Sequence, residues 1–506
     1  MMKQKRIFLE VIGLALLPLA TSAQIYQDVS NSTATIVRDP ARQASTEIDA
    51  VIHNPAGTAF LDDGWHLSLS GKLSYRSFTL SDNHNDVEET MLDDIPSLQA
   101  AYKKGPWTLS LSIGNEGGYG RWTNFKEPML SRILTNTCNQ AFDVYKGMMS
   151  GIASNSCSPY DQLVNYVMVS GDLYNYSARI GAAYQINQNL SVYGGLRLNY
   201  VTEKTSVGVS RWVEMANSGK KTTRDYFNDV DADFRKTIQD FKEPYEMLVE
   251  IGNILGADVS KAQEYIELCN LLTDVLGAYN NGIAATPDYT FLIDKRTNGW
   301  GISPVIGLDY KTGKFNFAAK YEFETKIHTQ GSCMAYHIPS VLSLGASWQM
   351  KDNFKVAVGG SLHHQSSNSI YGRSQTTDIS NEDLYFNMGT SVGNQTSFHT
   401  ASNSLTSGDI SASVSFSPIE HLMLSVGYTY AKQSLNYKGS FLQVMPIAEN
   451  LQADIISGGL RYDISDKVQL DFGISKKSST GGHYYADYSL YGLREINMSA
   501  GININL

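Results

Sequence analysis

The sequence predicts an all-β protein: a 14-stranded antiparallel transmembrane β-barrel with long, partly helical extracellular loops. Three observations predict it. The chain has 30 Tyr and 42 Gly but only 18% charged residues. Apolar and polar residues alternate over most of its length, and short turns alternate strictly with long connections. These features are typical of barrels whose strands turn one side chain to lipid and the next to the lumen.

The first 23 residues predict a secretory signal peptide. Lys3, Lys5 and Arg6 form a basic start, an apolar core covers residues 7–20, and a small-residue cleavage site follows at residues 21–23. Beyond it no run approaches the roughly 18 to 20 apolar residues that a spanning helix needs. The net charge of −10 and the lack of a basic cluster argue against nucleic acid as a partner. We expect three segments: the signal peptide (1–23), a polar N-terminal segment without a strand pattern (24–64) and the barrel (65–506).

The C-terminus carries the clearest strand pattern, in which every second residue is apolar and the residues between them are small or polar. The apolar set is Ile496, Met498, Ala500, Ile502, Ile504 and Leu506. Strands in soluble proteins rarely alternate for so long, and a strand that reaches the last residue is typical of outer-membrane barrels. Such barrels usually end in an aromatic residue, and Leu506 departs from that.

Applied to the whole chain, the alternation gives fourteen strands, the first from Trp65 to Tyr75. Six connections are tight turns, near residues 103–106, 187–188, 311–314, 351–353, 417–420 and 463–466. The other seven are longer: 81–95, 115–169, 202–298, 327–337, 365–407, 433–451 and 479–492. Short periplasmic turns and long extracellular loops are the layout of a transmembrane barrel. We therefore expect a multi-pass β-barrel of the outer membrane with both barrel ends on the periplasmic side.

Loop 202–298 contains a helical pattern from Tyr245 to Tyr279, with apolar residues at helical spacing. These helices either pack on each other over the barrel mouth or offer an apolar surface to a ligand. All four cysteines, Cys138, Cys157, Cys269 and Cys333, fall in the expected outer loops, where a disulfide would stiffen them. Cys138 with Cys157 is the local pairing, and free thiols are the alternative. None has CxxC spacing, so no metal site is expected.

Several stretches resemble the FadL/TodX family of outer-membrane transporters for long-chain fatty acids and other hydrophobic compounds. Asn54-Pro55-Ala56-Gly57 is similar to the NPA motif of that family's plug. Three more stretches resemble family strands or turns in the same order along the chain: residues 183–190, 297–310 and 338–345. The chain lacks the Gly-Gly stretch that many relatives have before the NPA motif. It has Asp39-Pro40 there, which predicts a helix N-cap and a first-turn proline.

The resemblance implies passive uptake of a hydrophobic compound, such as a long-chain fatty acid, with lateral release at a kink in the third strand. The resemblance also implies that residues 24–64 form an N-terminal plug (hatch) inside the lumen. This plug would be gated at Asn54, Pro55, Ala56 and Gly57, which we expect to face the opening. The kink and the opening would lie at Gly114, Asn115, Gly117, Gly118 and Gly120. Glycine suits a kink because it allows unusual backbone angles and blocks no passage. The expected partners are a hydrophobic small molecule, membrane lipid and lipopolysaccharide. No cofactor is expected, and the barrel would be a monomer.

By the alternation, four cations point into the lumen: Arg179, Arg197, Lys320 and Arg461. They are candidate contacts for a ligand carboxylate. The alternative is that they form lumenal ion pairs with Glu322 and Glu324, which point inward by the same count.

Two other function classes stay open. A surface adhesin or receptor would bind a partner through loop 202–298. An outer-membrane lipid hydrolase would use His363 and His364, although no nucleophile motif or carboxylate partner is identifiable. We expect the protein not to be an enzyme.

Overall fold

The structure is a computed structural model that describes residues 33–82, 85–216, 219–284, 289–329, 337–368, 371–372, 398–399, 403–436, 452–480 and 488–506. The predicted signal peptide and Cys333 lie outside these residues. Contacts divide the chain into two compact units. We call them the barrel unit (residues 1–123, 170–205 and 295–506) and the loop unit (residues 124–169 and 206–294).

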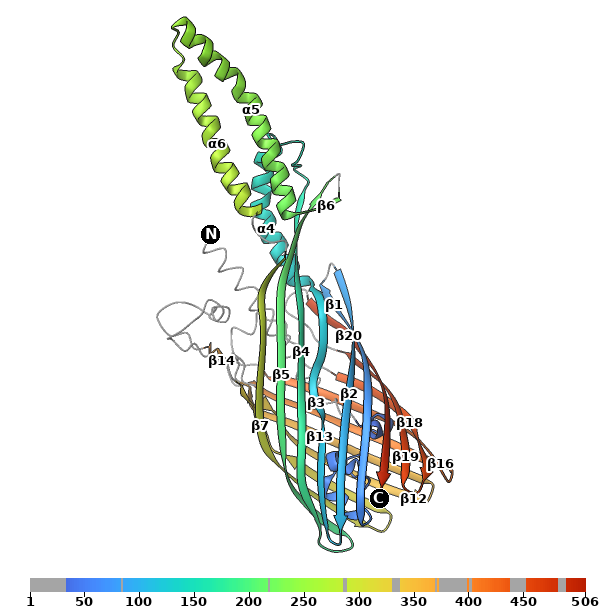
Figure 1. The fold of residues 1–506 in the computed structure, drawn as a ribbon. Coiled ribbons are helices and arrows are strands. Elements are labelled where there is room, and N and C mark those ends of the chain that lie inside the picture. Colours follow the sequence, from blue (N-terminus) through green and yellow to red (C-terminus); the bar gives the residue numbers. More distant parts are fainter. Residues whose placement is uncertain are drawn as a thin grey trace. The chain divides into compact units, whose positions relative to one another are not determined.

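Fourteen long antiparallel strands form a closed barrel (Figure 1), as predicted. They are β1 (Gly64–Asp82), β2 (Asn85–Lys104), β3 (Trp107–Glu127), β4 (Gln162–Gln185), β5 (Leu190–Met215), β7 (Tyr289–Thr312), β8 (Phe315–Glu322), β12 (Ser340–Lys351), β13 (Phe354–Asn368), β16 (Asn403–Ile419), β17 (Leu422–Asn436), β18 (Gln452–Ser465), β19 (Val468–Thr480) and β20 (Tyr488–Asn505). Each strand pairs with its neighbours along the chain, β5 pairs with β7, and β1 pairs with β20. This last pairing closes the sheet.

Six shorter strands complete the described set: β6 (Gly219–Thr222), β9 (Thr325–Lys326), β10 (His328–Thr329), β11 (His337–Ile338), β14 (Tyr371–Gly372) and β15 (Phe398–His399). The six tight turns lie where the sequence predicts them. Gly105 and Gly313 take φ angles of 58° and 55° in two of these turns, a backbone conformation that favours glycine.

Several strands run beyond their predicted ends. β3 reaches Glu127 and β5 reaches Met215, so the expected loops 115–169 and 202–298 begin as strand. The alternation test misses these extensions for a physical reason. Outside the hydrocarbon layer an outward side chain no longer needs to be apolar, although the hydrogen-bonded ladder can continue.

The two faces of the barrel strands differ as the alternation predicts. On β19, Phe472 and Ile474 are 45% and 53% exposed, whereas Asp471, Ser475 and Lys477 are buried on the lumenal side. The last strand repeats the pattern, since Ile496 and Met498 are exposed while polar residues between and beyond them are buried. An outer face of exposed large apolar side chains around a polar interior is the design of a transmembrane barrel.

Residues 33–62, which we call the N-terminal segment, consist of α2 (Ala34–Arg38), α3 (Ala50–His53) and the 3₁₀ helix η1 (Pro55–Phe60). Thr33 caps α2, its hydroxyl accepting a hydrogen bond from the Ile36 amide. Asp39 is the C-cap of α2, so the prediction that it starts a helix is wrong. The next helix begins only after Asp49. Nearly the whole segment is buried against inward-facing barrel residues.

The loop unit contains α4 (Pro128–Met149), α5 (Thr223–Leu255) and α6 (Ser260–Ala284). The last two contain the predicted helical pattern and form a hairpin (Figure 1). The hairpin turns at Gly256, which ends α5 with a left-handed φ of 71°. Buried side chains of α4 and of the first part of α5 form a core: Phe142, Tyr145, Met149, Tyr226, Phe227, Val230 and Phe234. None of the described helices is long and apolar enough to cross a membrane.

Candidate functional site

Arg42 holds the loop of the N-terminal segment in shape. Its guanidinium makes two hydrogen bonds to Asp49, of 2.7 and 2.8 Å, and further bonds to Glu47 at 2.6 Å and to Asp39 at 3.2 Å. Burial works against ionised carboxyls, yet Arg42 holds the pKa of Asp49 below its ordinary value. The segment is therefore folded around one buried cation.

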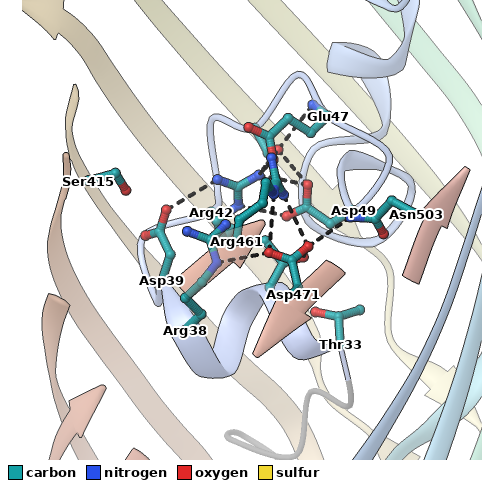
Figure 2. Close-up of polar contacts among 12 residues, drawn as sticks. Thr33, Arg38, Asp39, Arg42, Glu47, Asp49, Ser415, Arg461, Asp471 and Asn503 are labelled. Atoms are coloured by element: carbon teal, nitrogen blue, oxygen red, sulfur yellow. Dashed lines mark hydrogen bonds and ion pairs between the residues drawn. The ribbon is translucent and has the colours of Figure 1, made fainter. Parts of the chain in front are cut away.

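A second set of ion pairs joins this segment to the barrel wall (Figure 2). Asp471 of β19 accepts from Arg38 at 3.0 Å, from Arg461 of β18 at 3.1 Å and from Asn503 of β20 at 2.7 Å. Arg461 also donates to Glu47 at 2.8 Å. Arg461 points inward as predicted, and its described contacts are carboxylates of the protein itself.

The Asn54-Pro55-Ala56-Gly57 motif is buried against β3, β5 and β7. The Asn54 amide donates to Asp309 of β7 and, at 3.0 Å, to the Ser45 carbonyl. Ser191 of β5 donates to the Ala56 carbonyl at 2.7 Å, and Thr108 of β3 donates to the Thr58 carbonyl at 3.2 Å.

This position differs from the one expected for the motif. Thr108 lies six residues before Gly114 on β3, which is roughly 20 Å along a strand. The motif therefore packs near the start of β3 and does not face the stretch from Gly114 to Gly120. The expectation that the motif faces the glycine-rich stretch is therefore wrong, because the family resemblance does not fix where along the barrel axis the motif contacts the wall.

Gly57 fits its site only because it has no side chain. A Cβ atom at this position would collide with the Ser45 carbonyl oxygen and with the Asn54 side chain. Since Asn54 is held by Ser45 and Asp309, neither neighbour can move freely. The motif thus depends on tight backbone packing.

A cavity of about 210 Å³ lies between the N-terminal segment and the wall. Its apolar part includes Ile36, Val37, Ile52, Ile338 and Val341, and its charged part includes Arg179, Arg197, Lys320 and Glu322. Glu116, within the glycine-rich stretch of β3, also lines it. A lining that combines apolar and charged side chains suits a molecule with a hydrophobic body and a polar end.

The cations of this cavity converge on Glu322 of β8. Arg179 donates to both of its carboxylate oxygens at 3.1 and 2.9 Å, Lys320 contacts it at 2.6 Å, and Arg197 contacts it as well. Arg179 also contacts Glu116. Among the described residues this cluster has three cations and two carboxylates. Both interpretations from the sequence remain open, because the ion pairs are formed and one positive charge is left over.

Lys320 connects the same cluster to the N-terminal segment. Its ammonium group donates to the Ile52 carbonyl at 2.8 Å. The neighbouring His53 is buried, and burial lowers its pKa to about 3, so its imidazole is neutral at ordinary pH. The segment, the wall and the cavity thus share one polar network.

The glycine-rich stretch from Gly114 to Gly120 lies inside β3 and is not a loop. The last described pair of the β2–β3 ladder is Ser97 with Gly114. The buried Asn115 side chain accepts a hydrogen bond from the Gly117 amide at 3.3 Å. The side-chain surroundings of Gly118 and Gly120 lie outside the described part of the chain.

A bulge at the end of β8 was not predicted from the sequence. Between the pairs Val305–Glu322 and Trp300–His328, β7 advances by five residues while the opposite chain advances by six. The extra residue shifts the inward positions, so Thr325 is fully buried and Glu324 is only half-buried. The alternation holds for Glu322 but fails for Glu324. Pro304 in β7 and Pro339 between β11 and β12 are the sequence features that could have indicated it.

Cys138, Cys157 and Cys269 are free thiols. Cys157 accepts a hydrogen bond from the Tyr226 hydroxyl at 3.3 Å, and burial raises the pKa of its thiol. Cys138 and Cys157 belong to or pack against the same apolar core. A disulfide between them is not formed in the structure and stays a prediction.

His363 has a carboxylate neighbour that the sequence did not reveal, since its Nε2 atom lies 3.8 Å from Asp409 of β16. Among the described residues, no cluster of His, Cys, Asp or Glu could hold a metal ion.

The sequence missed Arg38, Arg42 and Asp471, which anchor the N-terminal segment. Asp471 could have been noticed, because it lies between the outward residues Leu470 and Phe472 and so had to face the lumen. The two arginines lie in a segment without periodicity, and nothing in the sequence assigns their partners.

Comparisons with known proteins agree with the fold. No protein-family model and no curated protein matches the sequence. Among solved structures, the toluene transporter TodX of Pseudomonas putida aligns over 94% of this chain and 99% of its own, with 13% identity and a TM-score of 0.51. A FadL homologue of Pseudomonas aeruginosa aligns over 94% and 98%, with 8% identity and a TM-score of 0.51. The chain therefore has the fold of the FadL- and TodX-type outer-membrane channels.

Proposed function

We propose that this protein takes up hydrophobic compounds passively across an outer membrane. The observation that carries the proposal is the cavity between the N-terminal segment and the barrel wall, whose lining combines apolar side chains with a cluster of cations. An apolar compound gains about 0.8 kcal/mol for each CH₂ group that leaves water. Capture in such a site needs no energy source.

The substrate class follows from the lining. The cluster of Arg179, Arg197 and Lys320 against Glu116 and Glu322 has one excess positive charge, which matches one ligand carboxylate. An apolar compound with a single carboxylate, such as a long-chain fatty acid, fits this arrangement. Arg461 is not a ligand contact in this proposal, because its guanidinium already forms ion pairs with Glu47 and Asp471.

The cavity volume sets a limit on what binds without movement. An engineered apolar cavity of roughly 150 Å³ holds benzene, so about 210 Å³ accommodates a compact molecule. A long acyl chain needs further space, which a displacement of the N-terminal segment would supply. A toluene transporter and a FadL homologue are among the similar structures, which is consistent with either cargo.

In this proposal the N-terminal segment is a plug and β3 is the exit. The ion pairs of the N-terminal segment with β18 and β19 hold it in the lumen, where it keeps water and ions from passing. Ligand binding beside Ile52 and His53 displaces the segment. The ligand then leaves sideways past Gly114 and Gly117. The end of the described β2–β3 ladder at Gly114 supports this route.

Uptake by purified protein in proteoliposomes tests the proposal. Fluorescent fatty acid and radiolabelled toluene are added outside the vesicles. Transfer to an acceptor inside the vesicles is measured and compared with protein-free vesicles. We expect transfer of at least one compound, and we expect Gly114→Leu with Gly117→Leu to abolish it. The matched control is Gly71→Ala, because a Cβ there meets open space. No transfer of either compound contradicts uptake. Transfer that survives the β3 substitutions contradicts lateral release only.

A further inference from the structure

The α5–α6 hairpin of the loop unit exposes a large apolar surface that the uptake function does not explain. Between Phe241 and Tyr279 its exposed large apolar side chains are Phe241, Met247, Leu248, Ile251, Ile254, Leu255, Tyr265, Leu268, Leu271, Leu272, Val275 and Tyr279. Ile254 alone is 77% exposed. Contiguous apolar surface of this kind marks interaction sites on folded proteins.

This surface is not the one that holds the hairpin together. The turn closes where Gly252 of α5 packs on Val259, just before α6, and the two helices contact each other where Gly277 of α6 lies against Arg235 of α5. The rings of Tyr245 and Tyr265 contact each other at 5.0 Å between centroids. Apart from Tyr265, none of the exposed apolar residues named above takes part in these contacts.

The spacing of the exposed residues is that of helix-to-helix packing. On α5 they include Phe241, Pro244, Leu248, Ile251 and Leu255, at successive steps of three and four. On α6 Tyr265, Leu268, Leu272, Val275 and Tyr279 follow the same steps. Steps of three and four over two heptads place a stripe along each helix that accepts the side chains of another helix.

The negative charge around these stripes favours a positively charged partner. From Asp240 to Tyr279 the hairpin has eight acidic residues, namely Asp240, Glu243, Glu246, Glu250, Asp258, Glu264, Glu267 and Asp274. Only Lys242 and Lys261 oppose them, and Lys242 already pairs with Glu246 at 2.8 Å. A second copy of the hairpin would bring like charges together, and so would an anionic lipid surface. A cationic partner meets no such cost.

We propose that the exposed apolar face of the α5–α6 hairpin binds a cationic amphipathic helix, with its apolar stripe on the two stripes of the hairpin and its Lys and Arg residues beside the flanking carboxylates. Burial of the apolar stripes supplies most of the affinity. The charges set the choice of partner and speed its association.

A pair of designed peptides tests the proposal with the full-length protein in phosphatidylcholine nanodiscs. One peptide carries leucine and lysine in heptads, and its match carries leucine and glutamate. Binding is measured by fluorescence anisotropy, with empty nanodiscs as background. We expect the lysine peptide to bind at least about tenfold more tightly than its match, and its affinity to fall as salt is raised.

Two sets of variants separate the apolar and charged contributions. Leu248→Ser, Ile251→Ser and Leu271→Ser together should weaken binding by about tenfold or more. The matched control, Asn253→Ser, Gln263→Ser and Asn270→Ser, changes exposed polar positions on the same helices and should leave binding unchanged. Glu250→Gln, Glu264→Gln and Glu267→Gln should flatten the salt dependence.

Three results would overturn the proposal: equal binding of both peptides, binding unaffected by the apolar variants, or cross-linked dimers in proteoliposomes that the apolar variants abolish. The last result would assign the face to a second copy of the chain. All these variants alter exposed side chains of the hairpin, so uptake of hydrophobic compounds serves as an independent check that the barrel is intact.

Discussion

Arg38, on the first helix of the N-terminal segment, donates a 3.0 Å hydrogen bond to Asp471 of β19, and water reaches neither side chain to any extent. The two residues are 433 positions apart in the sequence. Because Asp471 also holds Arg461 and Asn503, one carboxylate fixes the segment to three adjacent strands. The contacts of the N-terminal segment with these strands therefore depend on this carboxylate.

Replacing Asp471 with Asn should loosen the segment. The change keeps the size of the side chain but leaves Arg38 and Arg461 buried with too little negative charge. Removing one partner of a buried ion pair costs roughly 3–5 kcal/mol. We expect a lower Tm and a higher ion conductance in planar bilayers. Asp466→Asn, in an exposed turn, is the control. Unchanged conductance would show that the segment seals the lumen without this anchor.

Gly57→Ala should destabilise the NPA region. The added methyl group meets the Ser45 carbonyl and the Asn54 side chain, and overpacking of this kind costs roughly 1–3 kcal/mol. Urea unfolding measures the loss, and Gly71→Ala is the control because its methyl group has free space. Equal stability of the two variants would mean that the motif shifts easily.

The stability of the N-terminal segment should fall as the pH is lowered from about 6.5. Burial lowers the pKa of His53 to about 3, below its ordinary value of 6.5. Between these values the unfolded chain binds a proton that the folded chain excludes, so acid favours unfolding by up to about 1.4 kcal/mol per pH unit. Above pH 6.5 this contribution does not change. Limited proteolysis across pH 4–8 measures it.

His53→Gln should flatten that dependence between pH 6.5 and about 4.5. Glu47 and Asp49 remain, and since their pKa values are below the ordinary range, they destabilise the segment only at lower pH. A variant that keeps the full slope above pH 4.5 would assign the pH sensitivity to another group.

Arg179→Gln should separate two classes of cargo. The variant removes the cation that bridges Glu116 and Glu322, so the cluster loses its excess positive charge. We expect fatty acid transfer to fall by about tenfold, equivalent to 1.4 kcal/mol, with toluene transfer little changed. Arg494→Gln, at an exposed position of β20, is the control. An equal loss for both compounds would indicate a structural role.

The thiols of the loop unit should react slowly while the protein is folded. Burial raises the pKa values of Cys138 and Cys157, which leaves little thiolate to react. Alkylation with iodoacetamide, counted by mass spectrometry before and after unfolding, measures this. If Cys138 and Cys157 instead form the predicted disulfide, neither is alkylated after unfolding until a reductant is added.

The sequence predicts the barrel well because lipid imposes a period of two on every strand. The strand number, the six turns and the inward direction of Arg179, Arg197, Lys320 and Arg461 follow from that rule. The alternation is not required outside the hydrocarbon layer, so the extensions of β3 and β5 were missed. It also fails at the β8 bulge, where one extra residue exchanges the faces of Glu324 and Thr325.

The candidate site was only partly predictable. The alternation identifies which charges enter the lumen, but it does not say which carboxylate each cation meets. Arg42 pairs within a loop that has no periodicity, and Arg38 finds its partner across almost the whole chain. Such pairs depend on how the segment folds inside the barrel, and no local pattern encodes that.

The pairing of β1 with β20 constrains how the protein is assembled. Leu67 lies opposite Ile504, and the Trp65 amide donates to the Leu506 carbonyl at 2.9 Å. β1 cannot pair with β20 until the end of the chain has been synthesised and is present. Contacts between residues so distant in the sequence form slowly. Until then β1 has an open edge that another chain can occupy. The nascent barrel therefore depends on protection of that edge during its passage to the membrane.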